Sequence, residues 1–226
     1  MAESKVQRIN QGWLTPLEAP ALAWLARRMP PWITPDILTG IGFAGLMVSA
    51  VSYAFSGWQP ALLWLASAGL LINWFGDSLD GTLARYRRIE RPRYGYFLDQ
   101  NIDALAQYIL AIGIGLSGYI RFEFSLLAIA AYFMISILSF TRALVSRVFA
   151  ITYAGVGPTE IRVAFATWNA LMFFFPPTPL NVYGALSYAD LLALLWTGSI
   201  VISFLISFRA ELRRLAQEEP PRTPQG

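Results

Sequence analysis

The chain contains no cysteine and no histidine among its 226 residues. The lack of cysteine excludes disulfide bonds and thiolate chemistry, and the lack of both residue types excludes zinc or iron sites that need sulfur or imidazole ligands. Charged residues are also scarce, at 14% of the chain, whereas a soluble domain carries about a quarter. Any chemistry must therefore depend on carboxylates, arginines, hydroxyls and amides.

Apolar residues are abundant instead, at 56% of the chain. Six apolar runs are long enough, or nearly so, to cross a bilayer as helices of roughly 20 residues. They lie at residues 35–55, 61–83, 96–118, 124–149, 160–175 and 188–208. The first ten residues are polar, so we expect no cleavable signal peptide. The sequence predicts an all-α, polytopic membrane protein with a terminal segment at 1–34, six transmembrane helices at 35–208 and a tail at 209–226.

Basic residues gather in alternate gaps between these runs. They lie before the first run, between the second and third, between the fourth and fifth, and after the sixth, while the other three gaps contain only Arg121. Because cytoplasmic loops carry an excess of lysine and arginine, this pattern predicts that both termini are cytoplasmic. We expect the inner membrane of a bacterium or an archaeon.

Residues 15–28 precede the first run and combine an apolar side with a basic end. Thr15 and Glu18 have the spacing of a capping box, and Arg27 and Arg28 close the segment. The pattern predicts an amphipathic helix on the cytoplasmic membrane surface, with a plain linker as the alternative. Thr34 is expected to cap the first transmembrane helix.

Four aspartates, Asp77, Asp80, Asp99 and Asp103, lie in or beside the second and third runs. At helical spacing, the first two share a face of one helix and the last two share a face of the next. A short basic loop joins the two helices, so we expect them to be antiparallel neighbours with their carboxylates facing each other.

This arrangement is costly without compensation, because an unpaired aspartate within a span costs about 2.5–3.5 kcal/mol and four cost roughly 10 kcal/mol. Protonation, pairing with arginine, or divalent cations could offset the cost, and helix capping is the structural alternative. Arg85 is the only basic residue that we expect inside the cluster. Oxygen ligands without histidine or cysteine favour Mg²⁺, Mn²⁺ or Ca²⁺, and two such ions balance four carboxylates.

The aspartates belong to a longer pattern, in which D-x2-D-G-x2-A-R is followed after nine residues by G-x3-D-x3-D. The positions are Asp77, Asp80, Gly81, Ala84, Arg85, Gly95, Asp99 and Asp103. With these residues the chain resembles the CDP-alcohol phosphotransferases, membrane enzymes of phospholipid synthesis. The resemblance implies that a CDP-linked alcohol is attacked at phosphorus by a second alcohol and that CMP leaves.

The resemblance also implies roles for the matching residues. The four aspartates would bind two divalent cations, Mg²⁺ or Mn²⁺, and Asp103 would be a ligand, the general base, or both. Gly81, Ala84, Arg85 and Gly95 would bind the nucleotide, and Asn73 joins them because it shares their helical face. The family's habit of forming dimers implies a homodimer in the membrane, and no nucleic-acid partner is expected.

The acceptor alcohol remains open between two routes. Arg142, Arg147 and Arg162 could bind a phosphorylated acceptor, with CDP-diacylglycerol as the favoured donor. The alternative is a choline or ethanolamine phosphotransferase that acts on diacylglycerol. The segment at 157–162 resembles a segment of those enzymes, and Glu160 within it would lie near a cationic headgroup. Those enzymes commonly carry histidine after the third aspartate, where this chain has Gln100.

Two functions of another class use the same residues. A divalent-cation transporter would need carboxylates along a path through the membrane, whereas all four aspartates lie at one end of their spans. A catalytically inactive scaffold would not need the complete motif. The sequence therefore favours the enzyme.

Overall fold

The computed structural model describes residues 7–9, 12–146, 148–150, 157–177, 179–180 and 186–219. Within these residues the chain is all-α apart from four very short strands. The helices are α1 Thr15–Arg28, α2 Pro35–Ser56, α3 Leu62–Arg87, α4 Pro92–Leu116, α5 Phe122–Val145, α6 Pro158–Phe174 and α7 Tyr188–Glu218. Strand β1 (Gln7–Ile9) pairs in parallel with β2 (Val148–Ala150), and β3 (Pro179–Leu180) pairs antiparallel with β4 (Leu186–Ser187).

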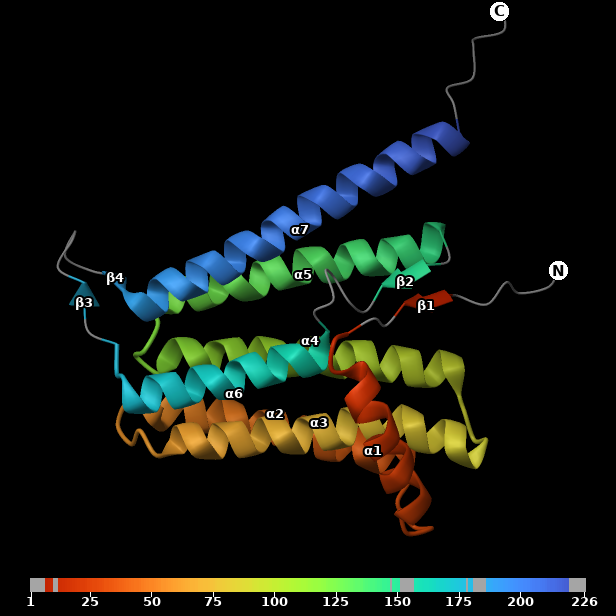
Figure 1. The fold of residues 1–226 in the computed structure, drawn as a ribbon, viewed down its shortest axis with the longest axis horizontal. Helices are drawn as coiled ribbons and strands as arrows, with labels where there is room; N and C mark the ends of the chain where they lie inside the picture. The colour runs from red at the N-terminus through yellow and green to blue at the C-terminus, as the bar shows by residue number, and fades with distance from the viewer. Residues whose placement is uncertain are drawn as a thin grey trace, which may run out of the picture.

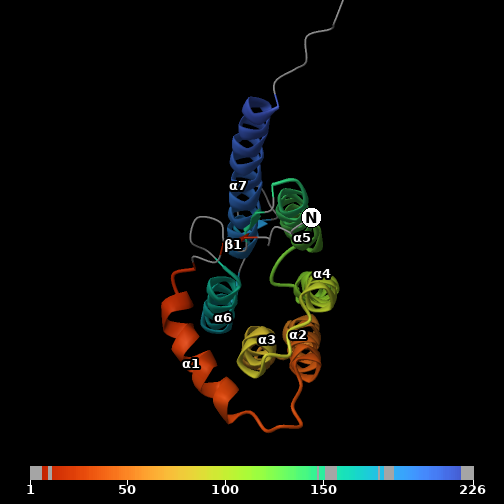
Figure 2. The same ribbon diagram turned by 90° about the vertical axis from the view of Figure 1, so that its right-hand side faces the viewer.

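Helices α2 to α7 form an elongated bundle, and α1 crosses it at a steep angle (Figure 1). Viewed along the bundle, α2 and α3 lie together at one side, α5 and α7 lie at the other, and α4 and α6 lie between them (Figure 2). The closely packed pairs are α2 with α3, α2 with α4, α4 with α5, α5 with α7, α3 with α6, and α1 with α3. Helix α4, which was expected to be an antiparallel neighbour of α3, packs more closely against α2 and α5 than against α3.

Four helices, α2, α3, α5 and α7, are long and apolar enough to cross a membrane. The remaining two predicted spans coincide with α4 and α6, which do not combine the length and the apolar composition of the other four. A total of six spans therefore stays a prediction. α6 has only 17 residues, and α4 carries two of the aspartates. Large apolar side chains such as Val51, Leu71 and Leu195 are exposed on the bundle, as expected for a surface that faces lipid.

The backbones of α2 and α3 touch through small residues. A Cβ atom added to Gly45 would lie 2.7 Å from the carbonyl oxygen of Gly69, and one added to Gly76 would lie 2.6 Å from the Cα atom of Gly42. Such small residues allow close helix approach in membranes. This contact fixes α3, which carries Asp77 and Asp80, against α2.

Helix α1 forms where it was predicted, but its predicted capping box is wrong. The N-cap residue is Leu14, whose side chain makes no cap. The Glu18 carboxylate instead accepts hydrogen bonds from Trp74 Nε1 at 3.2 Å and from Thr159 Oγ1 at 2.6 Å. The carboxylate therefore joins α1 to α3 and α6. The predicted cap of α2 is confirmed, since Thr34 Oγ1 accepts from the Ile37 amide at 3.2 Å.

One side of α1 packs on the bundle and another is exposed. Leu22 and Ala26 are buried in a cluster with Leu38, Leu79 and Leu83. Leu17 and Trp24 face outward, with 74% and 48% of their surface exposed. Placement of α1 on a membrane surface stays a prediction.

Candidate functional site

Three of the four predicted aspartates converge. Asp77 of α3 and Asp99 and Asp103 of α4 each offer a carboxylate oxygen, and these oxygens lie within 4.8 Å of one another. The spacing of four between Asp99 and Asp103 places them on one side of α4, which faces α3. Because α4 packs on α2 rather than closely on α3, the carboxylates have room between the two helices.

The fourth aspartate, Asp80, points elsewhere. Its carboxylate accepts a hydrogen bond from Thr39 Oγ1 at 2.6 Å and another from the Gly81 amide. Thr39 lies in α2, so this contact adds a polar link to the glycine-mediated packing of α2 and α3. The four predicted metal ligands are thus arranged as a convergent group of three with Asp80 beside them.

Arg162 of α6 reaches into the aspartate cluster. Its Nη2 atom forms an ion pair with Asp77, and its Nε atom donates to Asn73 Oδ1 at 2.7 Å. Its Nη1 atom is buried and has no hydrogen-bond partner among the described residues. The expectation that Arg85 is the only basic residue inside the cluster is therefore wrong. Sequence spacing could not reveal this contact, because 85 positions separate Arg162 from Asp77.

The predicted nucleotide residues lie around this cluster. Asn73 is buried, and its Nδ2 atom donates to the Gly42 carbonyl at 3.1 Å while its Oδ1 atom accepts from Arg162. Ala84 is half-buried. Arg85 is exposed and lies next to Gly81, and its Nη2 atom donates to Thr82 Oγ1 at 3.2 Å.

Gly95, in the first turn of α4, has open space where a Cβ would be. Gly95 and Arg85 thus leave room for a ligand, whereas Asn73 already has protein partners.

A cavity of about 720 Å³ adjoins the carboxylates and is lined by residues of α1, α3, α4, α5, α6 and α7. Asp77, Asp99 and Asp103 form part of its wall together with Arg85 and Arg162. The opposite wall, on α5 and α7, combines aromatic and aliphatic side chains with Ser136, Ser139, Ser199 and Ser203. The volume is in the usual range of small-molecule sites, about 300–1,000 Å³.

Of the residues predicted for the acceptor alcohol, Glu160 and Arg162 line the cavity together, whereas Arg142 does not. Glu160 lines the cavity and accepts hydrogen bonds from the Gly157 amide at 2.9 Å and the Leu14 amide at 2.7 Å. It therefore caps α6 and holds the beginning of α1. Arg142 is not part of the cavity wall and pairs with Glu211 of α7, with Nε–Oε2 at 3.1 Å. Arg147 lies outside the described residues.

The convergent carboxylates fit a hard divalent cation. Asp77, Asp99 and Asp103 supply oxygen atoms only, the ligand type that Mg²⁺, Mn²⁺ and Ca²⁺ prefer. One guanidinium, that of Arg162, balances only part of their charge. A divalent cation would offset the rest.

Comparison with known proteins agrees with this geometry. Residues 32–206 match the model of the CDP-alcohol phosphatidyltransferase family. An archaetidylinositol phosphate synthase of Pyrococcus horikoshii is 36% identical over 46% of this chain and 52% of its own length. A phosphatidylinositol phosphate synthase of Cutibacterium acnes is 29% identical over 49% of each chain, and cholinephosphotransferase 1 of Danio rerio is 28% identical over 40% of this chain and 25% of its own.

The chain thus spans about half the length of the first two curated relatives that it matches. The family model, in contrast, covers α2 to α6 and most of α7, which include every converging aspartate. The chain belongs to the CDP-alcohol phosphatidyltransferase family.

Proposed function

We propose that the chain transfers a substituted phosphate group from a CDP-linked alcohol to an acceptor alcohol and releases CMP. The observation that carries this proposal is the convergence of Asp77, Asp99 and Asp103 at the wall of a cavity large enough for a nucleotide or a headgroup. The family membership supports the same reaction. The domain at 35–208 would be the catalytic unit.

In the proposed reaction, the acceptor hydroxyl oxygen bonds to the phosphorus that carries the donor alcohol. The bond from this phosphorus to the oxygen of CMP breaks, and the acceptor proton passes to the Asp103 carboxylate. Arg85, Gly81, Ala84 and Gly95 would hold the nucleotide, and Arg162 would orient Asp77 and Asn73. Two divalent cations, Mg²⁺ or Mn²⁺, held by Asp77, Asp80, Asp99 and Asp103, would offset the diphosphate charge.

The favoured donor is CDP-diacylglycerol, with a small polar or phosphorylated alcohol as acceptor. A relative named phosphatidylinositol phosphate synthase supports this choice, and one named archaetidylinositol phosphate synthase supports a lipid-linked CDP donor without specifying diacylglycerol. The alternative, a choline or ethanolamine phosphotransferase that uses diacylglycerol, is favoured by Glu160 in the cavity wall and by relatives named cholinephosphotransferase. A donor and acceptor panel, read by mass spectrometry of the lipid product, separates the two.

The protein is integral to the membrane, and we propose that both termini and the cavity mouth face the cytoplasm of a bacterium or archaeon. We also propose a homodimer formed through membrane helices. A monomeric mass in nanodiscs would contradict the dimer, and labelling of single introduced cysteines from each side of the membrane tests the topology. The absence of native cysteine makes this labelling specific.

The reaction is tested by CMP release from protein in liposomes. We expect release that depends on Mg²⁺ or Mn²⁺, on donor and on acceptor, and we expect Asp103→Asn to abolish it. Asp36→Asn is the matched control, because Asp36 forms an exposed ion pair with Arg91 away from the cavity. Full activity of Asp103→Asn would remove Asp103 from the role of base, and flux of divalent cations without CMP release would favour a transporter.

A further inference from the structure

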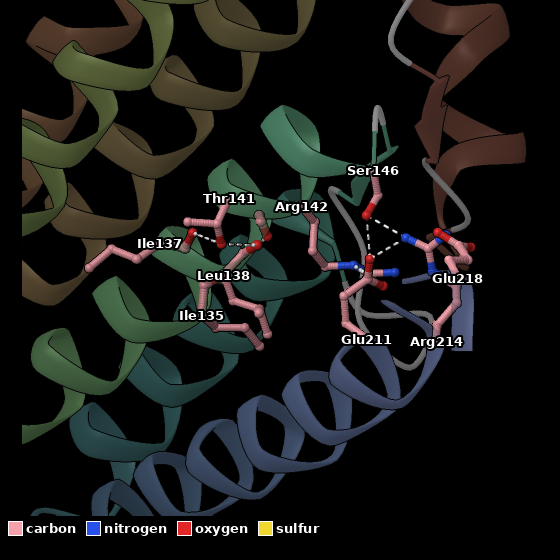
Figure 3. Close-up of polar contacts among 10 residues, drawn as sticks. Ile135, Ile137, Leu138, Thr141, Arg142, Ser146, Glu211, Arg214 and Glu218 are labelled. Carbon is pink, nitrogen blue, oxygen red and sulfur yellow. Dashed lines mark hydrogen bonds and ion pairs between the residues drawn. The ribbon is translucent and has the colours of Figure 1, made fainter. Parts of the chain in front are cut away.

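A second charged cluster lies where α5 ends, beside the last turns of α7 (Figure 3). Glu211 lies between two arginines, with its Oε2 atom 3.1 Å from Arg142 Nε and its Oε1 atom 2.5 Å from Arg214 Nη2. Ser146 Oγ donates a hydrogen bond to Glu211 and accepts one from Arg214. Three side chains, from α5, from its C-cap residue and from α7, therefore surround one carboxylate.

This carboxylate is well shielded from solvent. The side chain of Glu211 is 11% exposed and that of Arg142 is 23% exposed. Arg142 Nε is buried and, despite the ion pair, makes no well-aligned hydrogen bond among the described residues. Two guanidinium groups and a hydroxyl are the donors that proteins use to bind phosphate groups. Here these donors hold the protein's own Glu211 carboxylate.

The cluster lies further along α5 and α7 than the cavity wall, and none of its four side chains lines the cavity. Ser139 of α5 and Ser203 of α7 line the cavity wall. Arg142 follows Ser139 by three residues, about 4.5 Å along the helix at 1.5 Å per residue, and Glu211 follows Ser203 by about 12 Å. A charged group at the end of an acceptor alcohol in this part of the cavity would approach the cluster from the side of Ser139.

One of the two arginines in the described cavity wall already forms an ion pair. Arg162 is paired with Asp77. In the described part of the wall, Arg85 is the one basic side chain that makes no ion pair, and it lies on the side proposed for the nucleotide. An acceptor phosphate therefore finds no second free cation among the described wall residues.

We infer that Glu211 closes an anion site at the α5–α7 end and selects acceptor alcohols that carry no phosphate group. A phosphate here would meet the Glu211 carboxylate at close range, and displacing Glu211 would leave a buried charge without its partners. This inference rests on the proposed transfer reaction and narrows its acceptor class. It makes an unphosphorylated hydroxyl compound, either a polyol or a diacylglycerol, the substrate.

Two measurements test the inference. In the first, the wild-type protein receives CDP-diacylglycerol with inositol or inositol phosphate, and in parallel with glycerol or glycerol 3-phosphate. CDP-choline with diacylglycerol completes the panel. We expect turnover with an unphosphorylated acceptor to exceed turnover with its phosphorylated counterpart at least tenfold. A tenfold preference for a phosphorylated acceptor would overturn the inference while leaving the transfer reaction intact.

The second measurement does not require activity. Titration calorimetry with inorganic phosphate compares wild type, Glu211→Gln and the control Glu218→Gln in nanodiscs. Glu218 contacts Arg214 from an exposed position four residues further along the chain. We expect Glu211→Gln to bind phosphate at least tenfold more tightly than wild type and Glu218→Gln to match wild type.

Equal phosphate binding by Glu211→Gln and wild type would refute the inference, as would equal gains in both variants. If Glu211→Gln aggregates, Glu211→Ser takes its place, and the wild-type acceptor comparison decides independently. Absence of CMP release with every donor and acceptor would contradict the proposed reaction only. The phosphate titration does not depend on that reaction and still tests the anion site.

Discussion

Replacing Gly76 by alanine should separate α2 from α3 and disable the site without touching any polar residue in it. The new Cβ atom would lie 2.6 Å from Gly42 Cα and close to the Leu38 carbonyl oxygen. Carbon atoms in contact normally lie about 3.5–4.0 Å apart, so the backbones must move apart by about 1 Å. Overpacking of this kind costs typically 1–3 kcal/mol.

The same displacement reaches the chemistry, because Asp77 directly follows Gly76. A shift of 1 Å in a catalytic group can reduce the rate about 100-fold. We therefore expect Gly76→Ala to lower the unfolding temperature in detergent and to reduce CMP release by about 10- to 100-fold. The assay is a continuous CMP measurement in liposomes of fixed protein content.

Gly40→Ala is the matched control, since Gly40 lies on α2 with nothing within 4 Å of the added Cβ. Both substitutions gain about 1 kcal/mol of helix propensity, so the difference between them reports the steric contact. Wild-type stability and activity in Gly76→Ala, or equal losses in both variants, would refute the proposed role of the α2–α3 backbone contact.

Three further outcomes are expected. Removing divalent cations with EDTA should abolish CMP release and adding Mg²⁺ or Mn²⁺ should restore it; activity that persists in excess chelator would contradict a metal site. Arg162→Lys should reduce kcat/KM roughly 10- to 100-fold, because an ammonium group cannot contact Asp77 and Asn73 at the same time, as the guanidinium does. The lost hydrogen bond to a charged group contributes about 1.5–3 kcal/mol. Unchanged kinetics would show that Arg162 is not part of the site. Arg87→Lys should lower stability by about 1 kcal/mol, since the Arg87 guanidinium donates to four carbonyl oxygens in the α1–α2 connection, and a melting temperature equal to that of the exposed control Arg88→Lys would contradict this.

Helix positions were predictable because hydropathy and capping are local properties. The predicted first span at 35–55 corresponds to Pro35–Ser56, and Thr34 caps it as expected. The last span was expected to end at 208, whereas α7 continues to Glu218. Its final turns are polar and include Glu211 and Arg214. A prediction based on the length of the apolar run could therefore not include these turns.

The site was predictable only as far as it depends on spacing along one helix. Intervals of four placed Asp99 and Asp103 on one side of α4, and their convergence with Asp77 is confirmed. The contacts of Asp77 with Arg162 and of Asp80 with Thr39 join distant parts of the chain. Such contacts follow from how α6 and α2 pack, and no local pattern encodes that packing.

The unequal packing of the bundle has a consequence for how this chain can change. Backbone contact makes α2 and α3 a stiff unit that carries Asp77 and Asp80, and α4, which carries Asp99 and Asp103, packs on α2 to complete this acidic platform. Helices α5 and α7 pack on each other and join the platform mainly through α4. Substitutions on the α5–α7 wall can therefore reshape the space for an incoming alcohol while the acidic platform keeps its geometry. A single scaffold of this kind can acquire new lipid products by altering two helices and retaining the rest.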